Sequence, residues 1–279
     1  MFNSSDSLLL FVLAACLLIL MSLERVLPLQ ASSSLPGRKN FLHLVRNLSF
    51  AAIGALLASA LAVISLLTVL AMNQQWQFGL LYYLDTLDAL NPPGLASGIG
   101  WVIALLLFDG WQYAWHRMNH RIGLLWRFHA IHHADRSMDA STGVRFHFME
   151  LAISTLLRIP IVLLIGMQLQ HLLVYELLAL PVVLFHHANV RTGTGFDRAF
   201  RTLLVSPRMH RVHHQLEYEC CNSNFSSLLS VWDRLFSTYR KPVDIEHASL
   251  GVPDLSADTL QDMLWLPFRK QAPAPPPHQ

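Results

Sequence analysis

Long apolar runs separated by short polar segments dominate the chain up to residue 185. Five of them reach or approach the length needed to cross the roughly 30 Å hydrocarbon core of a bilayer, and they cover residues 7–26, 50–72, 98–115, 151–166 and 171–185. Met167 and Gln168 lie between the last two runs, which predict tilted spans or a re-entrant hairpin. The first run lacks a basic leader and an A-x-A-like cleavage site, so we expect an uncleaved anchor. The pattern predicts an all-α integral membrane protein with four to five transmembrane or re-entrant helices.

Composition and charge support a membrane location and suggest an orientation. Hydrophobic residues make up 53% of the chain and charged residues 14%, against about a quarter charged in a soluble domain. Lys and Arg are frequent after the first, third and fifth runs, whereas residues 73–97 contain neither. By the positive-inside rule we expect the N-terminus outside, the C-terminus in the cytoplasm, and a location in the bacterial inner membrane. A net charge of +2 without a basic-aromatic groove pattern gives no support for nucleic-acid binding.

Histidines recur at helical spacing just after the third run. Residues 111–133 contain five of the fifteen in the chain. Positions i, i+3 and i+4 share one face of a helix, so we expect His116 and His120 to point one way, and the H-x-x-H-H triplet 129–133 to do the same. A second such triplet spans residues 210–214, and a histidine pair lies at 186–187. Many neighbouring imidazoles cannot all be charged, and neutral imidazole is a common metal ligand, so the pattern predicts a metal site.

The type of metal site follows from ligand number. A closed structural zinc site takes four ligands, often with Cys, whereas this chain has at least eight clustered histidines, and Cys16, Cys220 and Cys221 suggest no disulfide framework. A zinc hydrolase of the H-E-x-x-H type has Glu where this chain has Arg117. Haem needs only one or two axial ligands. Two first-row metal ions are the prediction, and imidazole suits iron, copper and zinc alike.

Charged residues inside the apolar runs need partners. Asp109 precedes His116 by seven residues and shares its helix face, so we expect it to help orient the ligands. Arg158 and Glu176 lie nine residues on either side of Met167. An antiparallel hairpin turning there would bring them to one depth, so we predict an Arg158–Glu176 pair, with Asp109 as the competing partner of Arg158.

The position of the histidines suggests the substrate class. They follow the end of an apolar run, at the boundary between hydrocarbon and cytoplasm, where a lipid can present a carbon from the membrane while oxygen and electrons arrive from water. Six motifs follow in order: D-x6-H-x3-H, L-W-R-F-H-x2-H-H, R-F-H-x2-E, H-A-N, H-x2-H-H and W-D-R-L-F. They are Asp109 with His116 and His120; residues 125–133; Arg145, Phe146, His147 and Glu150; residues 187–189; residues 210–214; and residues 232–236. In combination they resemble the fatty acid hydroxylase and sterol desaturase superfamily of membrane-bound di-iron oxygenases.

The resemblance implies a helical membrane fold with a cytoplasmic histidine-rich helical cap, and two Fe ions that use O2 to hydroxylate or desaturate a C–H bond of a lipid. Zinc can replace iron in purified protein. The implied ligands are His116, His120, His129, His132, His133, His187, His210, His213 and His214. Residues expected around them, as supports or further ligands, are Asp109, His147, His186, Asn189, Asn224 and Asp233. Ser226 and Ser237 stand where the family often has glycine.

The implied domains are a two-span region (1–97), a di-metal catalytic domain (98–245) and a C-terminal segment (246–279) whose Pro/Ala tail, residues 271–279, we expect to be disordered. The expected substrate is a fatty acyl, sterol or ether-type lipid. No cytochrome, flavin or iron–sulfur motif is visible, so electrons are expected from a separate donor, a ferredoxin, cytochrome b5-like protein or reductase. The arginines at 191, 198, 201, 208 and 211 would suit an acidic donor or anionic headgroups, or simply form a solvated face. The alternative function is a histidine-rich metal-binding or metal-transport protein without oxygenase activity.

Overall fold

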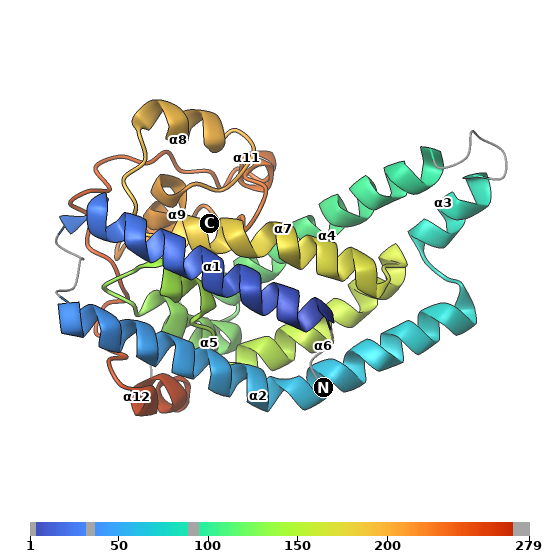
Figure 1. Cartoon of the computed structure of the whole chain (residues 1–279), viewed down its shortest axis with the longest axis horizontal. Coiled ribbons are helices and arrows are strands. Elements are labelled where there is room, and N and C mark those ends of the chain that lie inside the picture. Colours follow the sequence, from blue (N-terminus) through green and yellow to red (C-terminus); the bar gives the residue numbers. More distant parts are fainter. Residues whose placement is uncertain (1–3, 32–36, 89–94, 270–279) are drawn as a thin grey trace.

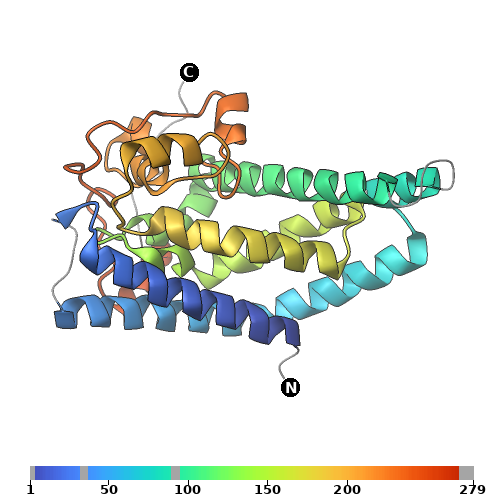
Figure 2. The same ribbon diagram turned by 45° about the horizontal axis from the view of Figure 1, so that its top comes forward.

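The computed structural model describes residues 4–31, 37–88 and 95–269, and within these ranges the protein is helical, with isolated bridges but no strands. The long helices run side by side, and the short helices of the second half gather at one end of them (Figures 1 and 2). The predicted disordered tail lies outside the described residues. The elements are α1 (Ser4–Val26), α2 (Gly37–Trp76), α3 (Leu80–Asp88), α4 (Leu95–Arg121), α5 (Gly123–His133), η2 (Ala140–Val144), α6 (Phe148–Ile165), α7 (Leu169–His187), α8 (Thr194–Phe200), α9 (Pro207–His213), α10 (Tyr218–Cys221), α11 (Val231–Leu235), α12 (Leu260–Trp265) and η3 (Leu266–Phe268).

Four helices are long and apolar enough to cross a membrane: α1, α2, α6 and α7. Their outward side chains are largely apolar, and Leu18 and Leu56 are 72% and 75% exposed, which suits contact with lipid. The predicted run at 98–115 lies in α4, which is not one of the four. Its second half contains Asp109 and Gln112, which lower its mean hydropathy. The all-helical membrane class is confirmed, and α4 packs against α6 and α7.

The turn between α6 and α7 makes the hairpin that the apolar pattern suggested. Gly166 ends α6 in the left-handed conformation (φ 81°), which suits a residue without a Cβ. The amide of Asn73, near the end of α2, donates to the carbonyl of the buried Met167 at 2.9 Å. Helices of 18 and 19 residues are about 27 and 28 Å long, so both have the length of full spans.

A buried polar network joins α2 to the histidine-rich end. His43 on α2 contacts the carboxylates of Asp135 and Asp139 at 2.9 and 3.0 Å. Arg145, which is 1% exposed, donates to the Asn47 side chain of α2 and to the Ile131 carbonyl of α5. These contacts fix the loop that follows α5, so the histidine-bearing helices have a rigid support.

A second network holds the start of α9. The Glu24 carboxylate of α1 accepts from the backbone nitrogens of Ala140 and Asn189, both at 2.8 Å. Arg211 is fully buried and donates to Gln30, Met138 and Asn189. The expectation of a surface role was therefore wrong for Arg211, because its guanidinium joins α9 to the core.

Candidate metal centre

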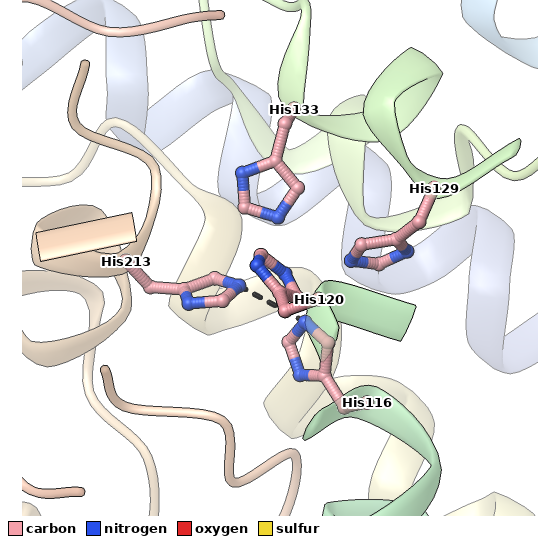
Figure 3. A group of neighbouring side chains, drawn as sticks. All are labelled: His116, His120, His129, His133 and His213. Atoms are coloured by element: carbon pink, nitrogen blue, oxygen red, sulfur yellow. Dashed lines mark hydrogen bonds between the residues drawn. The ribbon is translucent and has the colours of Figure 1, made fainter. Parts of the chain in front are cut away.

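Two adjacent groups of buried histidines lie where α4, α5, α7 and α9 meet. In each group, one potential ligand atom per residue lies within 4.8 Å of all the others. The larger group is shown in Figure 3, where the five rings converge from three separate segments of the chain. It consists of His116, His120, His129, His133 and His213, and the smaller group of His132, His187, His210 and His214. All nine predicted ligands are thus brought together.

Helical geometry explains how two triplets serve two groups. Within each H-x-x-H-H triplet the outer histidines are four residues apart and lie nearly above one another, whereas the middle one points about 100° away from its next neighbour. His129 and His133 therefore enter the larger group while His132 enters the smaller. On α9 the roles are reversed, because His210 and His214 enter the smaller group and His213 the larger. The prediction that all three rings of a triplet point the same way is therefore only partly correct, because two rings enter one group and the third enters the other.

Hydrogen bonds on the outer sides of the rings define their tautomers. The Nδ1 atoms of His116, His213 and His187 each lie 2.7 Å from a backbone carbonyl, those of Phe225, Ser223 and Val183. A carbonyl oxygen only accepts, so each Nδ1 carries the proton and each Nε2 presents a lone pair. The Nε2 atoms of His116 and His213 nevertheless lie 2.9 Å apart. Two facing lone pairs repel each other, and a cation between the rings would remove that repulsion.

The smaller group has the same inward convergence. The Nε2 of His187 lies 3.1 Å from the Nε2 atoms of both His132 and His210, and that of His214 lies 3.2 Å from His210. In the larger group the buried Nε2 atoms of His120, His129 and His133 have no hydrogen-bond partner among the described residues. Buried polar atoms in a folded protein normally find one. Three inward nitrogens without a partner, beside six more that contact only one another, fit metal ions.

Burial keeps these rings neutral. Desolvation, reinforced by neighbouring imidazoles, lowers the pKa of His213 to about 3. The same causes hold the pKa of the other clustered rings outside the spans well below its usual range, namely His116, His120, His132, His133, His210 and His214. Neutral imidazole is the ligand form, so little proton release would oppose metal binding near neutral pH.

Cys221 lies behind two of these rings, a contact that the sequence did not reveal. Its sulfur is 3.9 Å from Nδ1 of His120 and 3.8 Å from Nδ1 of His133. Burial raises the pKa of its thiol to about 12, so the thiol remains protonated. The sulfur faces the outer nitrogens, away from the convergence of the Nε2 atoms. We therefore assign Cys221 to the support of the rings and leave both groups with nitrogen donors only.

Glu150 belongs to the site, although the sequence analysis named it in a motif and assigned it no role. One of its carboxylate oxygens accepts from Nδ1 of His129 at 2.8 Å and from the Asn119 amide at 3.2 Å. The other carboxylate oxygen is buried and has no hydrogen-bond partner among the described residues. A carboxylate behind a ligating histidine fixes its tautomer and raises its basicity. The three-residue spacing between His147 and Glu150, at the start of α6, was the sequence feature that could have pointed to this role.

Glu150→Gln should lower metal affinity by roughly 10- to 100-fold, the usual effect of losing such a partner. The substitution preserves the shape of the side chain and removes the negative charge that raises the basicity of His129. Competition with a chelator measures the affinity, and Glu217→Gln, at an exposed position, is the matched control. Unchanged affinity in Glu150→Gln would contradict a role for this carboxylate.

Gly143 allows η2 to pass close to the smaller group. A Cβ at this position would lie 3.2 Å from Nδ1 of His187 and 3.3 Å from the Val183 carbonyl that this nitrogen contacts. Gly143→Ala should therefore displace His187 by a few tenths of an ångström and weaken the smaller site several-fold, while the larger site keeps its affinity. Titration of the apo-protein with metal resolves the two affinities. Gly123→Ala, where a Cβ meets nothing within 4 Å, should change neither, and equal weakening of both sites would contradict this assignment.

Neither of the two carboxylates predicted to support the ligands bonds to a clustered histidine among the described residues. Asp233 accepts from the backbone amides of Phe225 and Ser226 at 2.8 and 2.9 Å. It thereby orders the segment in which the Phe225 carbonyl accepts a hydrogen bond from Nδ1 of His116. Asp109 accepts from the Tyr175 hydroxyl and the Trp232 indole, both at 2.7 Å, and from the Leu229 amide. Among the described residues it has no hydrogen bond to a histidine and no ion pair with Arg158.

The remaining predicted residues lie at different distances from the groups. The His186 ring lies 4.1 Å from that of His210 but belongs to neither group. His147 caps α6 by accepting from the Met149 amide. Asn189 contacts Gln30 and Arg211, and Asn224, in the left-handed conformation (φ 54°), bonds to backbone groups of Met209 and Arg240. Of these four residues, only His186 contacts the clustered rings directly.

A cavity of about 340 Å³ extends from the histidines between α6 and α7. This volume lies in the range of small-molecule sites, roughly 300–1,000 Å³. Its walls include His116, His132 and His187 at one end and Arg158 and Glu176 farther along the two helices. The histidines and these two charged side chains thus line one cavity.

Comparison with known proteins identifies the family. The fatty acid hydroxylase family model matches residues 101–238. The ornithine lipid hydroxylase of Rhizobium tropici is 33% identical over 173 residues (61% of this chain, 50% of that protein). Alkylglycerol monooxygenase of Homo sapiens is 28% identical over 144 residues (50% and 30%), and cholesterol 25-hydroxylase of Rattus norvegicus is 30% identical over 147 (50% and 46%). The chain therefore spans half or less of the length of these relatives, and no solved structure matches it significantly. The family match and these relatives together place the chain in the fatty acid hydroxylase superfamily.

Proposed function

We propose that the protein is a membrane-bound oxygenase that hydroxylates or desaturates a C–H bond of a lipid with O2 and external electrons. The observation that supports this proposal most strongly is that nine buried histidines converge in two groups at the end of a cavity between membrane-length helices. The five residues of the larger group and the four of the smaller would each hold one iron ion. Zinc, which imidazole also suits, would occupy the same nitrogens without redox chemistry.

Two bound iron ions would supply the activation of O2 and the oxidising power needed to remove hydrogen from an unactivated C–H bond. The chain itself supplies orientation. Backbone carbonyls and Glu150 hold the outer nitrogens of the rings, so that the inner nitrogens stay fixed and unprotonated. The cavity holds the lipid against the open side of both groups and excludes bulk water.

The membrane arrangement and the partners extend this proposal. We infer that the histidine-rich end faces the cytoplasm of a bacterial cell, in accord with the distribution of Lys and Arg, and that a separate protein donates electrons there. Arg191 and Arg198 are exposed at this end and suit an acidic donor. The relatives are named for an ornithine lipid, alkylglycerols and cholesterol. These differ in headgroup and skeleton but are all lipids, which supports a lipid substrate.

Lipid mass spectrometry tests the proposal. Cells that express the wild-type chain with an electron donor should contain a lipid that differs by one oxygen atom or two hydrogens from its precursor. A His132→Ala, His133→Ala variant, which removes one ring from each group, should lack this product. Identical lipids in both cells, with protein present and iron bound to the wild type, would contradict oxygenase activity and leave metal binding or transport.

A further inference from the structure

The cavity between α6 and α7 has a charged end inside the membrane-spanning region. Arg158 on α6 lies eight residues beyond Glu150, and Glu176 on α7 lies eleven residues before His187. At 1.5 Å per residue these separations are about 12 and 17 Å. Both side chains line the same cavity as the histidines. One continuous cavity therefore joins the metal-binding groups to a cation and an anion deep between two membrane-length helices.

These two charges line the same cavity, but they are not in direct contact. Within the described part of the chain, no ion pair shorter than 4.0 Å joins them, although each lies within the electrostatic influence of the other. Among the residues that the structure describes, the buried Nε of Arg158 has no partner, and a terminal nitrogen donates only to the Thr155 hydroxyl at 3.5 Å. Glu176 likewise accepts no hydrogen bond from the described residues. The predicted direct contact was therefore wrong.

Charged side chains within membrane helices are costly, and among the described residues neither Arg158 nor Glu176 contacts an opposite charge within 4.0 Å. Asp109, the other carboxylate at this depth, is already engaged by Tyr175 and Trp232. A structural ion pair would have the guanidinium and carboxylate in contact, since that geometry repays the most desolvation. An open arrangement around a cavity leaves room for a third group that both accepts and donates hydrogen bonds.

We propose that Arg158 and Glu176 together anchor a hydroxyl group of the lipid substrate. The inference rests on the proposed lipid oxygenase function and names the substrate class: an amphiphile whose hydroxyl lies about 12 to 17 Å from the carbon that is oxidised. The hydroxyl oxygen accepts from the Arg158 guanidinium, and the hydroxyl proton is donated to the Glu176 carboxylate. Each side chain thereby gains the partner that it lacks.

Charge balance favours a neutral hydroxyl over other polar groups. The two side chains carry opposite formal charges, so a lone carboxylate or ammonium would leave a net charge in the apolar region. A zwitterion would balance, but moving two full charges from water to this depth costs far more than moving one hydroxyl. A hydroxyl also matches the site by donating and accepting at once.

Binding to metal-free protein tests the anchor without requiring turnover. The full chain in phosphatidylcholine nanodiscs is equilibrated with octadecan-1-ol, octadecane or N-palmitoylornithine, a zwitterion, and bound molecules are counted by native mass spectrometry. The wild type should prefer the alcohol to the alkane by about tenfold or more, as expected for hydrogen bonds to charged groups. The double variant Arg158→Met, Glu176→Gln should lose this preference, and Arg158→Lys should retain part of it. Arg127→Met, at an exposed position, should keep it fully.

Three results would overturn the anchor: equal binding of alcohol and alkane by the wild type, a preference that survives in the folded double variant, or tighter binding of the zwitterion. Turnover by the iron-loaded protein adds an independent readout. Hexadecan-1-ol and octadecan-1-ol should be oxidised at the same carbon counted from the hydroxyl, and products counted from the methyl end would contradict the anchor. Preferential binding without any lipid product would instead refute the oxygenase function and leave the anchor standing.

Discussion

Replacing His213 by alanine should reduce the iron bound per chain from two equivalents to about one and reduce lipid oxidation by roughly a thousandfold or more, because residues that act as one unit fail together. His213 is the one member of the larger group that comes from α9, and its Nδ1 is fixed by the Ser223 carbonyl. Its removal opens the side of the group that faces His116. His210→Ala should have the same effect on the smaller group.

Elemental analysis of purified protein gives the iron content, and product formation with a reductant gives the activity. His247→Ala is the matched control, because His247 is exposed and belongs to neither group. Should His213→Ala bind two iron ions per chain and oxidise lipid at the wild-type rate, His213 would not be a ligand, and the division into five and four histidines would be wrong.

Arg145→Met should lower the free energy of unfolding by about 3 to 5 kcal/mol, the range for removing one partner from a buried charged network. Arg145 donates to three acceptors from separate segments: Asn47 of α2, Ile131 of α5 and Ala257 near the C-terminal helices. Its guanidinium also lies 3.7 Å from the Asp135 carboxylate. Burial opposes the charge of Asp135, but His43 and Arg145 outweigh it and hold the pKa of that carboxyl well below its usual range.

Denaturant unfolding in detergent measures this loss. Arg127→Met removes an exposed arginine from α5 and should change the free energy of unfolding by less than about 0.5 kcal/mol. An unfolding midpoint of Arg145→Met equal to that of the wild type would mean that the network between α2 and the loop after α5 does not stabilise the fold.

Helical periodicity and hydropathy predicted the class of the protein, and the family resemblance implied the nine histidines of its candidate centre. The i, i+4 step alone places His116 and His120, or His129 and His133, in one group. The division of each triplet between two groups was not predictable, because it depends on how α5 and α9 pack against each other. One residue of helical rotation directs His132 and His133 toward different partners, and only tertiary structure decides which.

Proximity was easier to predict than direct contact. Counting residues from the α6–α7 turn suggested that Arg158 and Glu176 lie near each other, and both line the same cavity. It did not reveal that both side chains open into a cavity. The partners of Asp109 were likewise not predicted, because Tyr175 and Trp232 come from distant segments. Cys221 and the backbone acceptors of Phe225 and Ser223 have no pattern in sequence that marks them.

Anomalous diffraction from crystals of the iron-loaded protein, recorded at the iron absorption edge, is the most direct test of the metal centre. Two peaks per chain are predicted. One should lie among the Nε2 atoms of His116, His120, His129, His133 and His213, and the other among those of His132, His187, His210 and His214. A single peak, or iron bound outside these histidines, would contradict the two-ion centre.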